Sequence, residues 1–251
     1  MLKSGKNLVK LENISKVYKN STEFAVNGVS LHINKGEIFG LLGTNGAGKT
    51  TTFSMLCGLF PPTTGEIYIN KLSVRTQISE IKKIIGVVPQ NISLYPTLTA
   101  KENLFFFGKM YGLKKNELKK VTEHWLEIFG LSQYADKKIK TYSGGMKRRI
   151  NLIAGILHKP ELLLLDEPAV GIDAHSRLEI MQELKKINAV GTTIIYTSHY
   201  LEEAEKFCTD IAIIDKGKII TQGKPPELIK EAACSNLEEL FFNLTGNNTN
   251  V

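Results

Sequence analysis

A chain of 251 residues with 42% apolar side chains can bury a sizeable core, so its composition excludes an intrinsically disordered protein. No apolar run approaches the roughly 20 residues that cross a bilayer, and the N-terminal segment lacks the apolar core of a signal peptide, so we expect a cytoplasmic protein. The cysteines, Cys57, Cys208 and Cys234, are odd in number and lack Cys-x-x-Cys spacing, which disfavours a disulfide framework and a zinc site.

The net charge of +7 comes from one segment of the chain. Residues 91–155 contain twelve Lys and Arg and only five Asp and Glu, so the rest of the sequence is close to neutral. A basic excess can indicate nucleic-acid binding, but this one is lysine-rich and has no aromatics interleaved at regular spacing.

The first third of the sequence predicts short strands separated by turns. Residues 8–14, 25–33, 37–43 and 66–70 are apolar runs of strand length, and period-two alternation in the second indicates a half-exposed strand. A further apolar run at 84–90 predicts a buried strand. Together they indicate a small sheet beside the start of an α/β core.

The segment between the third of these strands and a helical run at 51–59 fits the pattern Gly-x-x-x-x-Gly-Lys-Thr, over residues 43–50. Glycines let backbone N–H groups surround phosphates, and the helix N-terminus adds positive potential. Lys49 can reach the β- and γ-phosphates, and Thr50 can bind Mg²⁺. Chance would produce the four fixed positions in a chain of this length on the order of 1% of the time. The pattern therefore predicts a nucleotide phosphate site.

Two helices are predicted in the basic segment. Thr99 and Glu102 form a capping box at the start of the first, which Gly112 can end. Asn116 is expected to cap the second, which Gly130 can end. The apolar face predicted for the second helix consists of Leu118, Val121, Trp125 and Phe129.

Ser143, Gly144 and Gly145 precede a long amphipathic helical segment. Ser143 is well placed as its N-cap, and the free amides at the helix start form an anion site. Taken alone, such a segment is usually a cap and a turn.

A run of leucines at 162–165 predicts a buried strand that ends in Asp166 and Glu167. The carboxyl edge of an α/β sheet is where ligands bind. One carboxylate can hold Mg²⁺ through water, and the other can polarise a water for attack on a γ-phosphate. The alternative for this pair alone is a strand end followed by an acidic turn.

The rest of the sequence continues the alternation of helix and strand. It predicts a helix at 176–187, a strand from 192 that ends before His199, a hairpin turning at Lys216 and Gly217, a last helix at 237–246 and a loose tail.

In this order, the segments resemble the nucleotide-binding domain of the ABC transporter family, over about residues 8–225. The resemblance implies an α/β fold in which a P-loop (RecA-like) core carries an antiparallel β-subdomain and a helical signature subdomain. By resemblance, the core with its β-subdomain occupies 1–90 and 156–226, the helical subdomain 91–155, and a C-terminal helix and loose tail 227–251.

The resemblance also assigns residues to the nucleotide. Tyr18 matches the aromatic residue that stacks on adenine, although read alone it is a strand-end tyrosine. Residues 43–50 match the Walker A motif. The expected nucleotide contacts are Tyr18, Gly43, Thr44, Asn45, Gly46, Ala47, Gly48, Lys49, Thr50 and Thr51.

Three residues match the family's catalytic positions. Gln90 corresponds to the Q-loop glutamine, Glu167 to the catalytic carboxylate of Walker B and His199 to the switch histidine. Without the family, a histidine at a strand end is more often a structural cap. By resemblance, Mg²⁺ is held by Thr50, Gln90 and Asp166.

A further set is expected to act on the ATP held by an opposing subunit. Ser143, Gly144 and Gly145 match the family signature, and Asp173 matches the D-loop aspartate that crosses the dimer interface. The signature usually ends in Gln where this chain has Met146, as in branches that resemble drug or polysaccharide export systems.

The resemblance implies an ATP-hydrolysing subunit, with ATP and Mg²⁺ as cofactors, that powers transport through dimer closure. Its expected partners are membrane-spanning subunits and either a second copy of itself or a similar cassette, with no nucleic acid. It would be cytoplasmic and peripheral on the inner face of the membrane, where the basic helical lobe lies near anionic headgroups. Alternatively, the lysines Lys114, Lys115, Lys119 and Lys120 form a solvated helix face.

Two other functions compete with transport. A cassette ATPase acting on nucleic acid or the ribosome generally carries long coiled-coil or zinc-bearing insertions, or two cassettes, and this sequence has neither. A small-molecule kinase with a phosphate loop would leave the Ser143 segment and His199 unexplained.

Overall fold

The computed structural model describes residues 7–19 and 21–246. The chain divides into two compact units: residues 1–82 with 193–251 form unit 1, and residues 83–192 form unit 2. Among the described residues, no helix combines the length and apolar character needed to cross a bilayer. The predicted helical subdomain, residues 91–155, lies inside unit 2. The boundaries predicted for the core and for the C-terminal segment remain untested.

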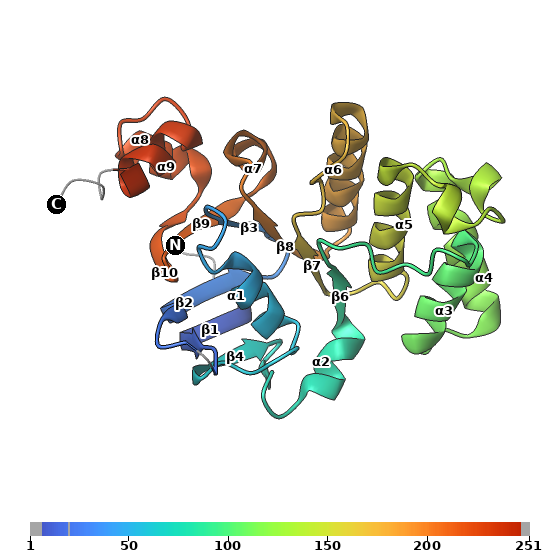
Figure 1. Ribbon diagram of the computed structural model, residues 1–251, viewed down its shortest axis with the longest axis horizontal. Helices are drawn as coiled ribbons and strands as arrows, with labels where there is room; N and C mark the ends of the chain where they lie inside the picture. The colour runs from blue at the N-terminus through green and yellow to red at the C-terminus, as the bar shows by residue number, and fades with distance from the viewer. Residues whose placement is uncertain (1–6, 20, 247–251) are drawn as a thin grey trace. The chain divides into compact units, whose positions relative to one another are not determined.

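An antiparallel sheet in unit 1 contains the first two strands of the chain (Figure 1). The order is β2-β1-β4-β5, and Leu11 of β1 pairs with Leu31 on one side and with Ile67 on the other. β2 alternates buried and exposed side chains along its second half, as the sequence predicted for a half-exposed strand. The strands are β1 (Asn7–Val17), β2 (Phe24–Asn34), β4 (Thr64–Ile69) and β5 (Leu72–Ser73).

A second group of strands in unit 1 carries the phosphate loop. β3 lies between β8 and β9 and runs parallel to both, while β10 pairs antiparallel with β9. Every residue of β3 and β8 is buried, which accounts for the continuous apolar sequence of β3 and for the apolar centre of β8. Lys216 and Gly217 form the β9–β10 turn with positive φ, as predicted. These strands are β3 (Ile38–Leu42), β8 (Thr193–Ser198), β9 (Asp210–Asp215) and β10 (Lys218–Gly223).

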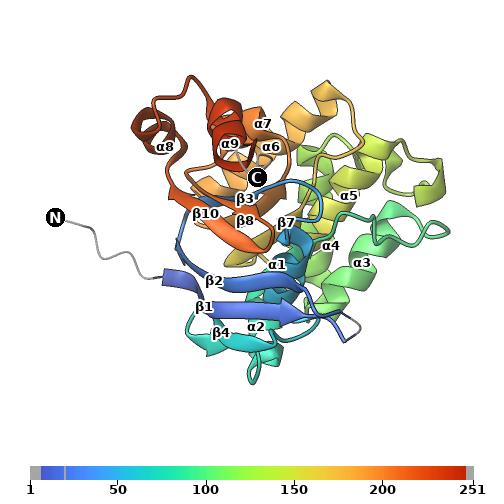
Figure 2. The same ribbon diagram turned by 60° about the vertical axis from the view of Figure 1, so that its left-hand side comes forward.

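Unit 1 also contains helices α1 (Lys49–Leu56), α7 (Leu201–Phe207), α8 (Pro225–Glu231) and α9 (Leu237–Thr245). α9, the predicted last helix, contacts both α7 and α8 (Figure 2). α8 was not predicted, although two prolines at its start are a helix N-terminal signal. Of the predicted loose tail, residues 247–251 lie outside the described residues.

In unit 2, β6 (Ile85–Val88) and β7 (Leu162–Asp166) pair in parallel, and the helices include α5 (Gly144–Ile156) and α6 (Ala174–Ala189). α5 lies directly against β6. A Cβ added to Gly86 would stand 2.1 Å from the Gly155 carbonyl, so these glycines permit backbone contact between helix and strand. α2 (Ile78–Ile84) leads into β6.

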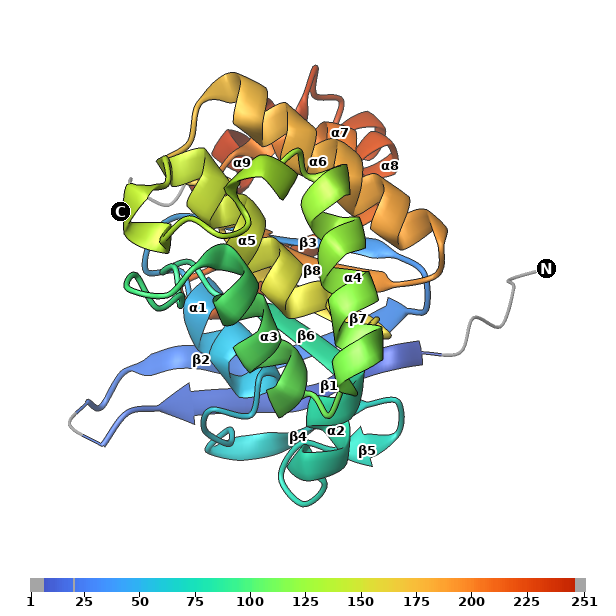
Figure 3. The same cartoon turned by 90° about the vertical axis from the view of Figure 1, so that its right-hand side faces the viewer.

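Helices α3 (Ala100–Met110) and α4 (Lys115–Ile128) pack with α5 in unit 2 (Figure 3). The capping box of Thr99 and Glu102 is present at the start of α3, as predicted. Two short 3₁₀ helices, at Ser132–Tyr134 and Ile139–Thr141, connect α4 to α5.

The prediction that Asn116 caps α4 is wrong. The Leu118 N–H bonds to the Lys114 carbonyl at 2.8 Å, so the helix ladder begins earlier and Asn116 is an exposed residue of the first turn. The predicted apolar face is right at Leu118 and Phe129, but Val121 and Trp125 are only half-buried. The helix itself buries Leu118, Thr122 and Leu126, a row with a spacing of four residues.

Candidate nucleotide-binding site

The phosphate loop of unit 1 joins β3 to α1, and two of its glycines have no space for a side chain. A Cβ at Gly43 would stand 2.3 Å from the Ile214 carbonyl, and one at Gly48 would stand 2.6 Å from the Ala25 carbonyl. Gly48 also has a φ of +111°, which L-residues rarely adopt. The backbone path therefore requires glycine at these two positions.

Lys49 is buried beneath this loop at 5% exposure. Its Nζ donates hydrogen bonds to the carbonyls of Gly43 at 2.9 Å and Thr44 at 3.0 Å. Thr52 anchors the first turn of α1 with a bond from its hydroxyl to the Gly48 carbonyl at 3.0 Å. The loop is therefore held in shape by its own lysine, with the exposed residues Thr44, Asn45, Gly46 and Thr50 around it.

Tyr18 lies just beyond β1, next to the phosphate-loop helix. Its hydroxyl is 3.2 Å from the Thr51 hydroxyl, and its ring meets Phe60 edge-on with centroids 5.9 Å apart. The side chain remains 45% exposed. Unit 1 thus brings together Tyr18, Lys49 and Thr51 at one end of α1.

His199 follows the last residue of β8 and is exposed, with its ring 4.2 Å from the Tyr200 ring. The turn around it is fixed from both sides: the Tyr200 N–H donates to the Ser198 hydroxyl at 2.9 Å, and the Tyr196 hydroxyl donates to Glu203 of α7. Burial, and then the charge of Glu203, raise the pKa of Tyr196 far above its usual range. Tyr196 therefore acts as a hydrogen-bond donor that orders the His199 turn.

In unit 2, Gln90 and Glu167 are in contact. Gln90 Nε2 donates to Glu167 Oε2 at 3.1 Å, although 77 residues separate them in the sequence. Both carboxylates at the end of β7 are buried, Asp166 at 4% and Glu167 at 8% exposure. Glu167 has a φ of +46°, in the left-handed region, and such backbone strain clusters at functional sites.

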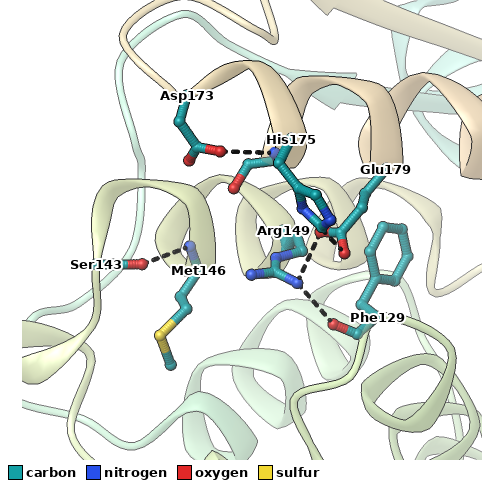
Figure 4. Close-up of polar contacts among 8 residues, drawn as sticks. Phe129, Ser143, Met146, Arg149, Asp173, His175 and Glu179 are labelled. Carbon is teal, nitrogen blue, oxygen red and sulfur yellow. Dashed lines mark hydrogen bonds and ion pairs between the residues drawn. The ribbon is translucent and has the colours of Figure 1, made fainter.

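The predicted signature residues start α5 (Figure 4). Ser143 is the N-cap, as predicted, and its hydroxyl accepts from the Met146 N–H at 3.2 Å. Gly145 faces α6, where an added Cβ would stand 2.7 Å from Ser176 Oγ. Asp173 caps α6 by accepting from the Ser176 N–H at 2.9 Å, and its hydrogen bonds to Ser176 lower the pKa of this carboxyl.

Arg149 ties α5 to neighbouring elements, as Figure 4 shows. Its Nη1 donates to the Phe129 carbonyl and to Glu179 Oε2, both at 3.2 Å. His175 Nδ1 lies 3.6 Å from Glu179 Oε1, so Glu179 faces two basic groups. The signature end of α5 is thus attached to α6 by a half-buried arginine.

Sequence reasoning missed Arg148 and Asn151, the side chains of α5 that bond to the Gln90 segment. Burial lowers the pKa of Arg148, and the charge of Glu167 acts in the opposite direction. A signal was available for Asn151, because it is the one polar residue in the apolar run at 150–157. No local pattern marks Arg148 among the three consecutive basic residues 147–149.

A glycine-built loop between a buried parallel strand and a helix, with a lysine held beneath it, defines a P-loop nucleotide-binding protein. A sequence model of the ABC transporter family matches residues 26–170, more than half of the chain. The chain therefore belongs to the ABC transporter family. It is an ATP-hydrolysing subunit of a transporter, as the order of its motifs predicted.

Relatives and solved structures agree with this assignment. The chain is 51% identical to the linearmycin resistance ATP-binding protein LnrL of Bacillus subtilis (strain 168), over 92% of this chain and 72% of that protein. It is 38% identical to the Nod factor export ATP-binding protein I of Ralstonia nicotianae, with coverage of 92% and 72%.

Among solved structures, the ATP-binding subunit of an ABC transporter aligns with a TM-score of 0.87 and 27% identity, over 95% of this chain and 99% of that one. A dimeric ATP-binding cassette in a post-hydrolysis state with ADP and Pi aligns with a TM-score of 0.78 and 30% identity, over 86% and 98%. The P-loop fold is thereby confirmed, and transport is favoured over the nucleic-acid alternative.

Proposed function

We propose that the chain hydrolyses ATP: the phosphate loop of unit 1 binds the phosphates, and the acidic strand end of unit 2 supplies the carboxylates for hydrolysis. The observation that carries the proposal is the bond between Gln90 and Glu167, which presents a buried carboxylate beside an amide where a water can be oriented. Lys49 and the loop amides bind the phosphates, and Tyr18 stacks on the base.

The residues present suit a magnesium ion. Among the described residues there is no group of three or more His, Cys, Asp or Glu side chains that could hold a metal. A nucleotide-associated Mg²⁺ needs no such cage, because it takes one or two carboxylates together with phosphate oxygens and water. Asp166, the Thr50 hydroxyl and the Gln90 amide oxygen are donors of the right kind, and the ion would neutralise charge on the phosphates.

Glu167 would polarise the attacking water, and Gln90 would orient the carboxylate and the water together. His199 would donate to the γ-phosphate from the turn that Tyr196 and Ser198 hold in place. Removing a general base costs about 10²- to 10⁴-fold in rate. The rate of hydrolysis would therefore depend mainly on how the Glu167 carboxylate is positioned.

The signature residues would complete the site of a second subunit. The amides of Gly144 and Gly145 lie at the N-terminus of α5, where an anion is favoured by the helix dipole, and Ser143 and Asp173 cap neighbouring helices. The partner would be a second copy of this chain or a similar cassette. A solved relative that is a dimer with ADP and Pi supports this arrangement.

The membrane-spanning partner would lie against the chain at the inner face of the membrane, with this subunit in the cytoplasm. Export is the proposed direction, because the names of two relatives refer to linearmycin resistance and to Nod factor export. The exposed lysines of α4 would face anionic headgroups, each contributing about 1 kcal/mol when well placed.

Shared sites can be tested by mixing two inactive variants. Lys49→Ala removes the phosphate-binding lysine, and Ser143→Arg blocks the signature surface offered to the opposite subunit. A mixed dimer contains one site assembled from two intact halves, so we expect ATPase activity to return partially on mixing. If co-purification of differently tagged variants shows mixed dimers and the mixture stays inactive, the shared-site proposal is wrong.

A further inference from the structure

A half-buried arginine of α5 connects the two segments that carry Gln90 and Glu167. Arg148 donates from Nη1 to the carbonyl of Gln90 itself, and from Nη2 to the Val170 carbonyl at 3.2 Å. Val170 closes the turn after β7, because its N–H donates to the Glu167 carbonyl at 3.2 Å. One planar guanidinium therefore joins the backbone at Gln90 to the turn that begins at Glu167.

The next turn of α5 holds the Gln90 segment a second time. Asn151 is buried at 4% exposure. Its Oδ1 accepts from the Ser93 N–H and its Nδ2 donates to the Pro89 carbonyl, both at 3.4 Å. Residues 148 and 151 are three apart and so lie on one face of the helix. This face of α5 therefore bonds to the backbone before Gln90, at Pro89, and after it, at Ser93.

Charge supports the same geometry. The Arg148 guanidinium is permanently protonated and close enough to Glu167 for their charges to interact. Its donors go to carbonyl groups and its charge acts on the carboxylate, so Glu167 keeps its side-chain contact with the Gln90 amide. The arginine thus restrains the positions of both residues while leaving that contact intact.

We infer that Arg148 is a positioning residue for ATP hydrolysis. Its guanidinium donates to the carbonyls of both Gln90 and Val170, and these two bonds keep the Gln90 amide in contact with the Glu167 carboxylate. The inference rests on the catalytic role proposed for Glu167. Arg148 acts through the backbone, so it sets turnover and leaves ATP binding nearly unchanged.

The test combines kinetics with hydrogen exchange of the nucleotide-free chain. Arg148→Met keeps much of the length and removes the fork. We expect kcat to fall about 10- to 100-fold, the range for a displaced catalytic group, while the KM for MgATP stays within about threefold. Amide exchange should quicken at residues 90–93, 167 and 169–171, which all carry a backbone N–H, and stay unchanged in α3 and α4. Lys147→Met, a neighbouring cation on the same helix, is the matched control and should match the parent.

Arg148→Lys keeps the charge without the planar fork, and it serves if the Met variant does not fold. It should show the same local increase in exchange with a smaller loss of kcat. Parental kcat and exchange in either variant, or a loss confined to KM, or faster exchange throughout unit 2, would each overturn the inference. Glu167→Gln separates the two proposals: if it still hydrolyses ATP, the catalytic assignment has failed, whereas an inactive Glu167→Gln beside a fully active Arg148→Met refutes only the role of Arg148.

Discussion

The phosphate loop of unit 1 and the acidic strand end of unit 2 are built in different ways. The loop is a backbone structure: glycines such as Gly48 allow its path, and Lys49 bonds to the carbonyls of the same loop. The strand end is a side-chain structure, in which Gln90, Arg148 and Glu167 arrive from distant parts of the sequence. Under the proposed roles, binding of phosphate depends on the conformation of one loop, and hydrolysis depends on tertiary contacts.

Glu167→Gln should separate the two regions most strongly. Glutamine keeps the shape but cannot accept a proton from water, so hydrolysis should fall by about 10²- to 10⁴-fold. The phosphate loop remains intact and ATP binding persists. ATP that bridges two subunits then shifts monomers towards dimers by mass action.

The measurement is size-exclusion chromatography with light scattering. The Glu167→Gln variant should be monomeric with ADP and dimeric with ATP, whereas Glu117→Gln, an exposed residue of α4, should behave like the parent. A variant that binds ATP tightly and remains monomeric would contradict ATP-driven closure of the isolated subunits.

Gly48→Ala should damage the other region. Its Cβ would approach the Ala25 carbonyl at a backbone conformation that alanine rarely adopts, so we expect a loss of roughly 2–3 kcal/mol in the free energy of unfolding. Gly36→Ala is the matched control, because Gly36 also has positive φ but open space around it. It should cost about 1 kcal/mol. Urea denaturation measures both, and equal losses would show that the close carbonyl at Gly48 is unimportant.

Tyr18→Ala should weaken nucleotide binding by roughly 1–3 kcal/mol, the range for a base stacked on an aromatic ring. Tyr18→Phe keeps the ring and loses only the contact between its hydroxyl and Thr51, so its affinity should stay close to that of the parent. Isothermal titration with ATP gives both dissociation constants. If the two variants lose affinity equally, the hydroxyl and not the ring face carries the interaction.

The smallest effect concerns Asp210, at the start of β9 in the sheet that carries the phosphate loop. Burial, and then the charge of Glu37, raise the pKa of Asp210 to about 6 from an ordinary 3.8. The folded chain therefore holds a proton that the unfolded chain has lost, and Asp210 makes the fold less stable as pH rises from about 4 to 6.

Asp210→Asn should remove this penalty. Because the carboxyl is only half-buried, solvent screening limits the gain in stability at pH 7 to about 1 kcal/mol, and the gain should disappear near pH 4. Thermal unfolding of both proteins at pH 4, 5, 6 and 7 checks the prediction. A stability difference that does not change with pH would mean that Asp210 does not titrate in this range.

The elements that were predicted correctly are those specified by neighbouring residues. The strands around the phosphate loop, the caps at Thr99 and Ser143 and the turn at Lys216 each depend on a short pattern. The cap expected at Asn116 failed because the preceding residues already continue the helical hydrogen bonds. The local sequence is compatible with a helix start at Lys114 or at Asn116, and the backbone hydrogen bonds show that the helix starts at Lys114.

The contacts of Arg148 could not be predicted in this way. Its bond to Gln90 spans 58 residues, and the chain offers three consecutive basic residues with the same local preference. Which of them faces the Gln90 segment follows from the rotation of α5, which is set by packing against β6 and α3. Family resemblance named Gln90 and Glu167 as site residues, and their side-chain contact became visible only in the structure.

At Glu167 the left-handed backbone lowers the stability of the fold, while the side chain is the one proposed for catalysis. Glycine would adopt this conformation without strain, which for a non-glycine residue costs on the order of 1–3 kcal/mol. A selection for thermal stability alone would thus favour glycine at position 167 and discard the carboxylate. The chain keeps a glutamate there, so its most stable sequence and its working sequence differ at the residue proposed to polarise the attacking water.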